Sequence, residues 1–192
     1  SSGQPILNLM EASANRGAQL VKQILAFAKG NPSERKIINI LDIFSDLESM
    51  IKETFPKNIK FGKCVSESIY RMSGDITQIH QVFLNLCLNA RDAMPSGGAL
   101  DIIIENMYLK ESQDLFGNSL EKGAYLKITC KDTGIGMSRE TLEHVMEPFF
   151  TTKGEGKGTG LGLSTVLTIV KKHEGILDIQ SELGKGTSIT VV

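Results

Sequence analysis

The segment Tyr125-Leu-Lys-Ile-Thr-Cys-Lys-Asp-Thr-Gly-Ile-Gly136 runs from alternating apolar residues directly into a glycine turn. The alternation over residues 125–131 predicts a strand with one buried face. Gly134 and Gly136 allow the backbone to pass close to a ligand, and Asp132 would stand at the end of the strand as a hydrogen-bond acceptor. Because Asp-x-Gly is also common turn chemistry, the interpretation depends on the sequence around this segment.

Strands and helices are expected on both sides of it, without a regular strand-helix-strand alternation. Further strands are predicted at residues 37–40, 59–65, 69–72, 99–109, 176–181 and 187–192, with residues 110–123 as a hairpin connection. Helices are predicted at residues 5–28, 41–55, 76–94 and 161–172, the third opened by the capping box Asp75-Ile-Thr-Gln78. This order predicts an α+β protein, a two-layer α/β sandwich whose mixed, mostly antiparallel sheet packs on about three helices and follows one N-terminal helix.

The helix at residues 76–94 carries a polar stripe. Asn85, Asn89 and Asp92 lie at i, i+4 and i+7, beside an apolar face. A hard cation such as Mg²⁺ takes oxygen ligands and keeps phosphates among them, so an amide oxygen that faces a triphosphate is a suitable protein contribution. An isolated pair of asparagines would more simply be hydrogen-bonded within a helix, so the stripe gains weight only from the other motifs.

Residues 147–162 are rich in glycine and contain Lys153 and Lys157. Backbone amides and ammonium groups of such a segment can surround phosphates, and the helix that begins near Leu161 offers unsatisfied N–H groups at its amino end. The segment is therefore predicted to be a lid over a phosphate site. The chain contains neither the P-loop pattern nor a Gly-x-Gly-x-x-Gly after a strand, so neither of those nucleotide sites is expected.

Four blocks thus occur in a fixed order: Asn85-Leu-Cys-Leu-Asn-Ala90, Asp132-Thr-Gly-Ile-Gly136, Glu147-Pro-Phe-Phe-Thr-Thr-Lys153 and Gly154-Glu-Gly-Lys-Gly-Thr-Gly-Leu-Gly162. They resemble the N, G1, F and G2 boxes of the sensor histidine kinases, within the gyrase, Hsp90, kinase and MutL superfamily, whose Bergerat-type ATP-binding fold matches the expected sandwich. Residues 16–28 resemble the end of the second helix of the kinase dimerisation hairpin. The resemblance implies a truncated dimerisation and phosphoacceptor hairpin at residues 1–31 and a catalytic ATP-binding domain at residues 32–192.

This resemblance implies a site for ATP and Mg²⁺. Asn89 would be the metal ligand with Asn85 in support, and Asp132 would accept a hydrogen bond from the adenine amine and so favour adenine over guanine. Phe149 and Phe150 would anchor the lid by apolar burial. The implied ATP-binding residues are Asn85, Asn89, Asp92, Asp132, Gly134, Gly136, Met137, Thr152, Lys153, Gly158, Thr159, Gly160, Leu161, Gly162 and Thr187.

The implied reaction is transfer of the γ-phosphoryl group of Mg-ATP to a histidine on a dimerisation hairpin, in two-component signal transduction. The implied partners are the histidine-bearing hairpin of the parent protein and the receiver domain of a response regulator, with a homodimer in the full-length parent. His80, His144 and His173 lack the sequence context of a phosphoacceptor. The acceptor and its acidic base are therefore expected outside this chain, which would not phosphorylate itself.

Two positions depart from the commonest family pattern. Asp92 occupies the place where many members carry a phosphate-binding lysine, which leaves part of the phosphate clamp unaccounted for. Met146 replaces a frequent phenylalanine. Because Asn-Ala-Arg-Asp-Ala-Met94 resembles a subgroup of these kinases, nucleotide binding is still expected.

Composition narrows the setting. The formal net charge is -1, from 21 basic and 22 acidic residues, so no electrostatic footprint for nucleic acid is expected. Three scattered cysteines and the lack of a membrane-length apolar run predict a cytoplasmic domain of a parent protein that is either soluble or membrane-anchored. Each cysteine is expected to be a small buried apolar residue.

Two other functions compete with the kinase. An ATPase switch of the gyrase or Hsp90 type would use a glutamate to activate water where this chain has Asn85, and an amide cannot act as a general base. A degenerate domain that only binds a partner protein would not need Asn89, Asp132 or the lid glycines. Slow hydrolysis together with adenine-nucleotide binding would separate the kinase from both.

Overall fold

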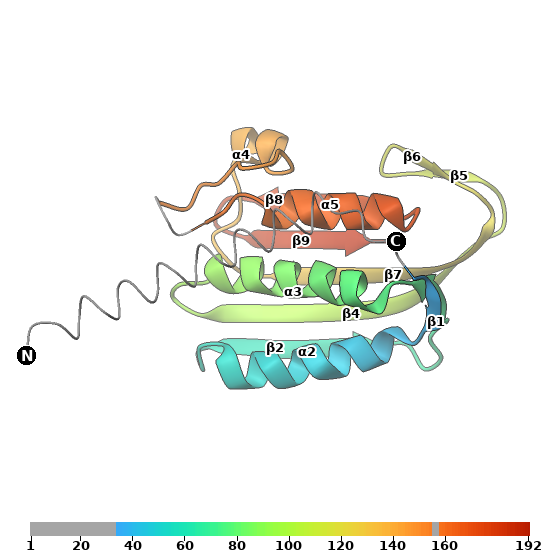
Figure 1. Cartoon of the computed structure of the whole chain (residues 1–192). Coiled ribbons are helices and arrows are strands. Elements are labelled where there is room, and N and C mark those ends of the chain that lie inside the picture. Colours follow the sequence, from blue (N-terminus) through green and yellow to red (C-terminus); the bar gives the residue numbers. More distant parts are fainter. Residues whose placement is uncertain (1–33, 155–157) are drawn as a thin grey trace, which may run out of the picture. The chain divides into compact units, whose positions relative to one another are not determined.

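A five-stranded sheet forms one layer of the domain, with the strand order β2-β4-β7-β9-β8 (Figure 1). The strands are β2 (Ile59–Val65), β4 (Gly98–Leu109), β7 (Gly123–Asp132), β8 (Leu177–Glu182) and β9 (Gly186–Val191). In this sheet β2 and β4 run parallel, whereas the pairings β4 with β7, β7 with β9 and β8 with β9 are antiparallel. The expected mixed, mostly antiparallel sheet is therefore confirmed.

The computed structural model describes residues 34–154 and 158–192. Glu34–Val192 forms a compact unit by itself. The helix expected over residues 5–28 lies outside the described residues, and so does the assignment of residues 1–31 to a dimerisation hairpin.

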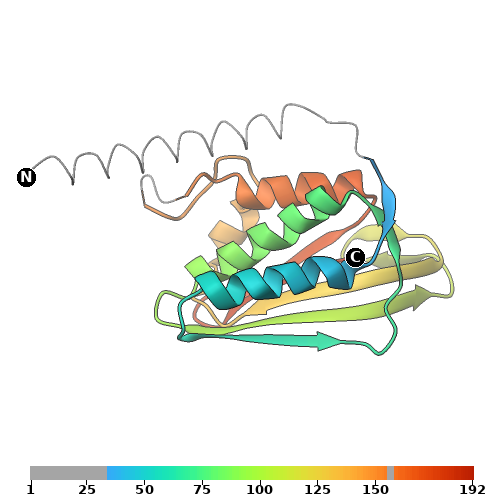
Figure 2. The same cartoon turned by 60° about the horizontal axis from the view of Figure 1, so that its bottom comes forward.

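Three helices cover one face of the sheet, namely α2 (Ile40–Thr54), α3 (Ile76–Asp92) and α5 (Gly162–Lys172) (Figures 1 and 2). Strand alternation selects that face, because successive side chains of a strand point to opposite sides. On β4, Leu100 and Ile102 are 0 % exposed, whereas Asp101 between them is exposed. An antiparallel sheet can bury one face and leave the other in water, which is the arrangement expected of the two-layer sandwich.

The central helix of this layer is α3, which lies between α2 and α5 in both views (Figures 1 and 2). Phe83 of α3 and Phe44 of α2 are each 1 % exposed, and their ring centroids are 4.6 Å apart. Val166 of α5 is 0 % exposed in the same apolar cluster. The helix that carries the polar stripe is therefore fixed by burial on both sides.

The start of α3 is capped in a modified way. Asp75 Oδ1 accepts hydrogen bonds from the backbone N–H groups of Thr77 and Gln78 at 2.9 and 3.1 Å. In a capping box the third side chain of the helix normally reaches back to the cap N–H. Here Gln78 Nε2 instead donates to Asp75 Oδ2, and the Asp75 N–H donates to His173 Nε2 at 3.1 Å. His173 Nδ1 bonds the Ile169 carbonyl at 2.8 Å, so this histidine ties the end of α5 to the start of α3.

Several short elements differ from the sequence prediction near the start of the unit. The strand β1 (Lys36–Ile38) is shorter than expected because Asn39 caps α2, its Oδ1 accepting from Leu41 N at 3.3 Å, so that Ile40 begins the helix. β1 pairs with β3 (Met72–Gly74), which lies later than the expected strand at residues 69–72. Apolar residues alone therefore misplaced two strand boundaries.

Other differences fall in polar segments. The connection at residues 110–123 contains a hairpin of its own, β5 (Gln113–Leu115) and β6 (Asn118–Leu120). A short helix, α4 (Arg139–His144), was not expected and begins after Ser138, whose side chain accepts from Thr141 N. Neither element has an apolar repeat long enough to be recognised in the sequence.

Two of the three cysteine expectations hold. Cys87 and Cys130 are buried, whereas Cys64 is exposed because it points to the sheet face opposite to that of its neighbour Val65, which packs against the core. In the part of the chain that the structure describes, no helix has the length and apolar content needed to cross a membrane.

The packing of Phe83 against Phe44 gives a stability test. Phe83→Ala is expected to lower the free energy of unfolding by about 3–5 kcal/mol, because it leaves a cavity between α2 and α3. Ile76→Ala on the same helix is the control, since Ile76 is 54 % exposed and its loss should change stability by no more than about 0.5 kcal/mol. Urea unfolding followed by circular dichroism measures both, and equal effects would contradict the assigned core.

Candidate functional site

The carboxylate of Asp132 is held at the end of β7. Asp132 is 7 % exposed, and its Oδ1 accepts backbone hydrogen bonds from Gly134 at 2.8 Å and Thr187 at 3.2 Å. Thr187 is the residue of β9 that pairs with Asp132 in the sheet. Within the described residues Asp132 Oδ2 makes no hydrogen bond, so it is left as a free acceptor.

Burial changes the acidity of this group. It raises the pKa of the Asp132 carboxyl above its ordinary value, although the hydrogen bonds from Gly134 and Thr187 act in the opposite direction. A carboxyl with a raised folded-state pKa favours the folded protein at low pH and loses that contribution as the pH rises through the raised value. At neutral pH the ionised group is therefore costly to bury, and a hydrogen-bond donor at Oδ2 would offset part of that cost.

The two glycines that follow are required by the protein's own backbone. Gly136 has φ +62°, and a Cβ there would lie 2.0 Å from the Glu182 carbonyl oxygen. A Cβ on Gly134 would lie 2.6 Å from the Ala93 carbonyl oxygen, which also accepts from Ile135 N at 2.9 Å. The turn is thus wedged between the end of α3 and the β8–β9 hairpin, a reason for these glycines that the motif alone did not give.

The polar stripe of α3 faces the start of α5. Asn85 Nδ2 donates to the Gly162 carbonyl at 3.4 Å, and a Cβ on Gly162 would lie 3.4 Å from Asn89 Nδ2. The side-chain amide of Asn89 makes no hydrogen bond to any residue of the described ranges. Leu161, the N-cap of α5, makes no side-chain capping bond. An unoccupied amide therefore lies beside uncapped helix N–H groups, an arrangement suited to a metal-bound phosphate.

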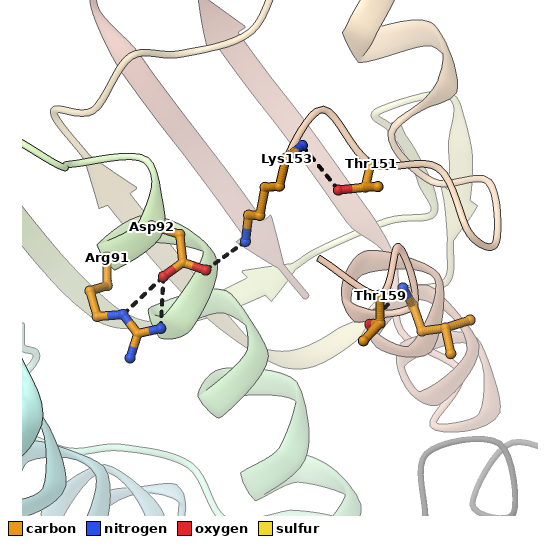
Figure 3. A network of polar contacts seen from close by, with 6 residues as sticks. Arg91, Asp92, Thr151, Lys153 and Thr159 are labelled. Atoms are coloured by element: carbon orange, nitrogen blue, oxygen red, sulfur yellow. Dashed lines mark hydrogen bonds and ion pairs between the residues drawn. The ribbon is translucent and has the colours of Figure 1, made fainter. Parts of the chain in front are cut away.

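The third stripe residue, Asp92, sits in an ion-pair network (Figure 3). Lys153 Nζ lies 2.6 Å from Asp92 Oδ2, and Arg91 donates to Asp92 Oδ1 through Nε at 2.9 Å and Nη2 at 2.7 Å. Burial opposes ionisation, yet the hydrogen bonds from Lys153 and Arg91 lower the pKa of the Asp92 carboxyl below its ordinary value. Asp92, which stands where the family resemblance implies a lysine, is therefore paired with two cations.

The rest of the glycine-rich segment is only partly described. Lys153 N donates to Thr151 Oγ1 at 3.1 Å, and Leu161 N donates to Thr159 Oγ1 at 3.3 Å (Figure 3). Thr152 is exposed, whereas Gly158 packs so closely that a Cβ there would lie 2.6 Å from Thr151 Oγ1. The close approach of Gly158 to Thr151 brings the two described ends of the segment together.

The two phenylalanines behave differently. Phe149 has φ 69° and is 68 % exposed, so the burial expected of it is not met by the described residues. Its N–H donates to the Gly160 carbonyl at 2.9 Å, which fixes the backbone rather than the ring. Phe150 is half-buried, with its ring centroid 5.8 Å from that of His144. Among the described residues, Phe150 has a ring contact of this kind and Phe149 has none.

Two residues near the site were missed by the sequence motifs. Arg91 lies between two recognised positions, and its charge next to Asp92 was the available signal. Ser181 accepts from the backbone N–H of Met137 at 2.9 Å and lies 2.9 Å from Thr187 Oγ1. Only the pairing of β8 with β9 reveals it, because it is 49 residues from Asp132 in the sequence.

A family model described as histidine kinase-, DNA gyrase B-, and HSP90-like ATPase matches residues 74–192, which contain all the expected ATP-binding residues. The chain belongs to this ATPase family. Its matched region begins one residue before the N-cap of α3, Asp75, and ends one residue after β9, so it includes both Asp132 and the polar stripe of α3.

Within the family, the similar curated proteins are sensor kinases. The chain is 37 % identical over 186 residues to sensor kinase CckA of Brucella abortus and 31 % identical over 175 residues to sporulation kinase A of Bacillus subtilis. These matches cover 97 % and 90 % of this chain but 20 % and 26 % of the relatives. The chain is thus the ATP-binding catalytic domain of the sensor histidine kinase type and spans about a quarter or less of these relatives' length.

Solved structures agree on the fold. The catalytic domain of histidine kinase ThkA matches with a TM-score of 0.66 and 27 % identity, over 82 % of this chain and 93 % of that one. The full-length kinase ShkA, solved with AMPPNP, matches with a TM-score of 0.76 at 19 % identity, over 100 % of this chain and 38 % of that one, which speaks for the fold alone. The expected α+β sandwich and the family resemblance are both confirmed.

The glycine turn gives a paired test. Gly136→Ala and Gly184→Ala both put a Cβ on a backbone with positive φ, +62° and +79°, but only the first meets backbone atoms, since nothing lies within 4 Å of a Cβ on Gly184. Gly184→Ala should cost about 1–2 kcal/mol from φ alone, and Gly136→Ala about 1–3 kcal/mol more from overpacking. Chemical unfolding of the two variants measures the difference. Equal losses would mean that the turn is not wedged against Glu182.

Proposed function

We propose that this chain binds Mg-ATP and transfers its γ-phosphoryl group to a histidine on a helical hairpin of its parent protein. The observation that carries the proposal is a pair of side chains in one domain. The buried Asp132 has a free acceptor oxygen, and the side-chain amide of Asn89 on α3 lies near Gly162 at the start of α5. One feature suits the amine of a base, and the other suits a metal-bound phosphate. Adenine and triphosphate are the two ends of one substrate.

The base end is built on β7 and β9. Asp132 Oδ2 accepts a hydrogen bond from the amine of adenine. Thr187 pairs with Asp132 in the sheet, and the Gly134-to-Gly136 turn and Met137 lie along the base. A buried carboxylate rejects a base that offers a carbonyl there, because two acceptors would face one another without a proton. This end supplies nucleotide choice.

The phosphate end is built on α3, α5 and the segment between Thr152 and Gly162. Asn89 would hold the metal ion with Asn85 as its neighbour, and Mg²⁺ would neutralise phosphate charge there. The N–H groups at the start of α5, with Gly158, Thr159, Gly160 and Leu161, surround the phosphates. Lys153, whose Nζ lies 2.6 Å from Asp92 Oδ2, supplies a cation for the phosphates.

These residues position the triphosphate rather than attack it. Phosphoryl transfer is assisted mainly by positioning and charge stabilisation, so the chain needs no nucleophile of its own. The acceptor histidine and its acidic base belong to the hairpin, for which residues 1–31 are the proposed second helix. Asn85 cannot activate water as a general base, which keeps hydrolysis slow and favours transfer over an ATPase cycle.

The proposed partners follow from the same chemistry. The kinase ThkA, which shares this fold, was solved in complex with the response regulator TrrA. This supports a receiver domain as the protein that takes the phosphoryl group from the histidine. In the full-length parent the hairpin would pair two copies, and the ATP-binding domain would lie in the cytoplasm.

The first test concerns binding. Calorimetric titration with a non-hydrolysable ATP analogue should show binding that requires Mg²⁺, and Asp132→Asn should weaken it by about tenfold or more because the acceptor is lost. Asp178→Asn on β8 is the matched control, since Asp178 bonds Gln180 and not the site. Absence of binding would overturn the proposal. Binding without phosphate transfer to an added hairpin that carries its acceptor histidine would leave an ATP-binding domain but remove the kinase.

The ion pairs of Asp92 give a second test, in which two substitutions should change triphosphate affinity in opposite directions. Lys153→Gln should weaken binding of the triphosphate analogue by about 10- to 100-fold, as expected for a lost charged hydrogen bond, and leave adenosine binding unchanged. Asp92→Asn should strengthen triphosphate binding by up to about fivefold, because the phosphates then no longer compete with a partly exposed ion pair for Lys153.

The control for this pair is Lys52→Gln, which removes a lysine bonded to Glu48 at 2.7 Å on α2. It should change neither affinity. Weaker triphosphate binding in Asp92→Asn would instead mean that Asp92 holds Lys153 in its binding position.

A further inference from the structure

A row of three polar side chains crosses three neighbouring strands. Asp132 of β7 pairs with Thr187 of β9, and Thr187 pairs in turn with Ser181 of β8. Directly paired residues of an antiparallel sheet project to the same face. The carboxylate and the two hydroxyls therefore lie in line, although Ser181 belongs to none of the four sequence motifs.

The contacts of Ser181 use its whole hydrogen-bonding capacity. Its Oγ accepts from Met137 N at 2.9 Å, lies 3.1 Å from the Gly186 carbonyl oxygen and lies 2.9 Å from Thr187 Oγ1. A hydroxyl has one proton and two lone pairs. Because a carbonyl oxygen cannot donate, the Ser181 proton goes to Gly186. The proton between the two hydroxyls then comes from Thr187.

This assignment of the hydroxyl protons determines which hydrogen bonds the Thr187 hydroxyl can make with a ligand. With its proton given to Ser181, its remaining lone pairs can only accept. Asp132 Oδ2, which is free of hydrogen bonds to the described residues, is also an acceptor when ionised. The two neighbouring groups thus form an edge that accepts and does not donate.

We propose that Ser181 is a positioning residue for base selection, which holds the Thr187 hydroxyl in its accepting direction so that a base amine is bound and a base carbonyl is rejected. The inference rests on the proposed function, which puts adenine at Asp132. It adds a residue from a third strand to the choice of base. Without Ser181 the Thr187 hydroxyl turns and donates to a carbonyl.

Hypoxanthine is the suitable probe, because it carries a carbonyl oxygen where adenine carries its amine. Calorimetric titration with the imido analogues of ATP and inosine triphosphate gives two dissociation constants and their ratio. In the unchanged chain the ratio should favour ATP strongly. Ser181→Ala should reduce the preference for the ATP analogue over the inosine analogue by about tenfold. This is the order expected when the Thr187 hydroxyl becomes free to donate to a base carbonyl. Ser181→Thr, which retains the hydroxyl, should restore it.

A double-variant cycle separates this role from simple support of the turn. If Ser181 acts through Thr187, then Ser181→Ala should leave the ratio unchanged in a Thr187→Val background, where the hydroxyl is already absent. Loss of support for Met137 would weaken both nucleotides alike and leave the ratio as it was. Thr190→Val is the control, since Thr190 bonds Thr129 at 3.2 Å on the opposite face of β9.

The outcomes are distinct. If the chain binds neither nucleotide, the proposed function itself is wrong. A selective chain whose ratio is unchanged by Ser181→Ala overturns the role of Ser181 and leaves the ATP site intact. Should Ser181→Ala fail to fold, Ser181→Cys replaces the hydroxyl by a weaker donor and acceptor of similar size, and the same narrowing is expected from it.

Discussion

The buried carboxylate of Asp132 is the constraint around which the site is arranged. An ionised group at this depth is tolerated because backbone N–H groups of Gly134 and Thr187 bond one of its oxygens. Those donors come from a tight turn and from a neighbouring strand, so the carboxylate requires both the glycines and the pairing of β7 with β9. Its other oxygen makes no hydrogen bond within the described residues, which is the basis of the proposed nucleotide selectivity.

The opposite end of the site depends on how α3 meets α5. Core packing sets the position of α3, and the bond from Asn85 to the Gly162 carbonyl ties its polar stripe to the first residue of α5. The helix start and the amide of Asn89 are thereby fixed before any phosphate arrives. Lys153 and Arg91 share Asp92 at a partly exposed position, where ion pairs contribute little to stability.

Most of the fold and of the site could be predicted from the chain because their signals are local. Alternation predicted β7, and the stripe on α3 followed from helical spacing. The prediction placed Ile40 in a strand because an apolar residue fits either element, whereas the Asn39 cap decides for a helix. Burial of Phe149 was expected from its apolar ring, but the residue has a positive φ and is 68 % exposed. Such outcomes depend on neighbours that the sequence does not place.

By itself the sequence determined the family and the two-layer fold, and it supplied the proposed site residues, because all of these depend on residue type and spacing. Tertiary structure alone decided the direction and partnership of those groups. The row from Asp132 through Thr187 to Ser181 exists because β7, β9 and β8 pair in one register. The meeting of Lys153 with Asp92 joins residues 61 positions apart. Hydrogen bonds and ion pairs form across space between specific atoms, and only the folded chain brings those atoms within reach.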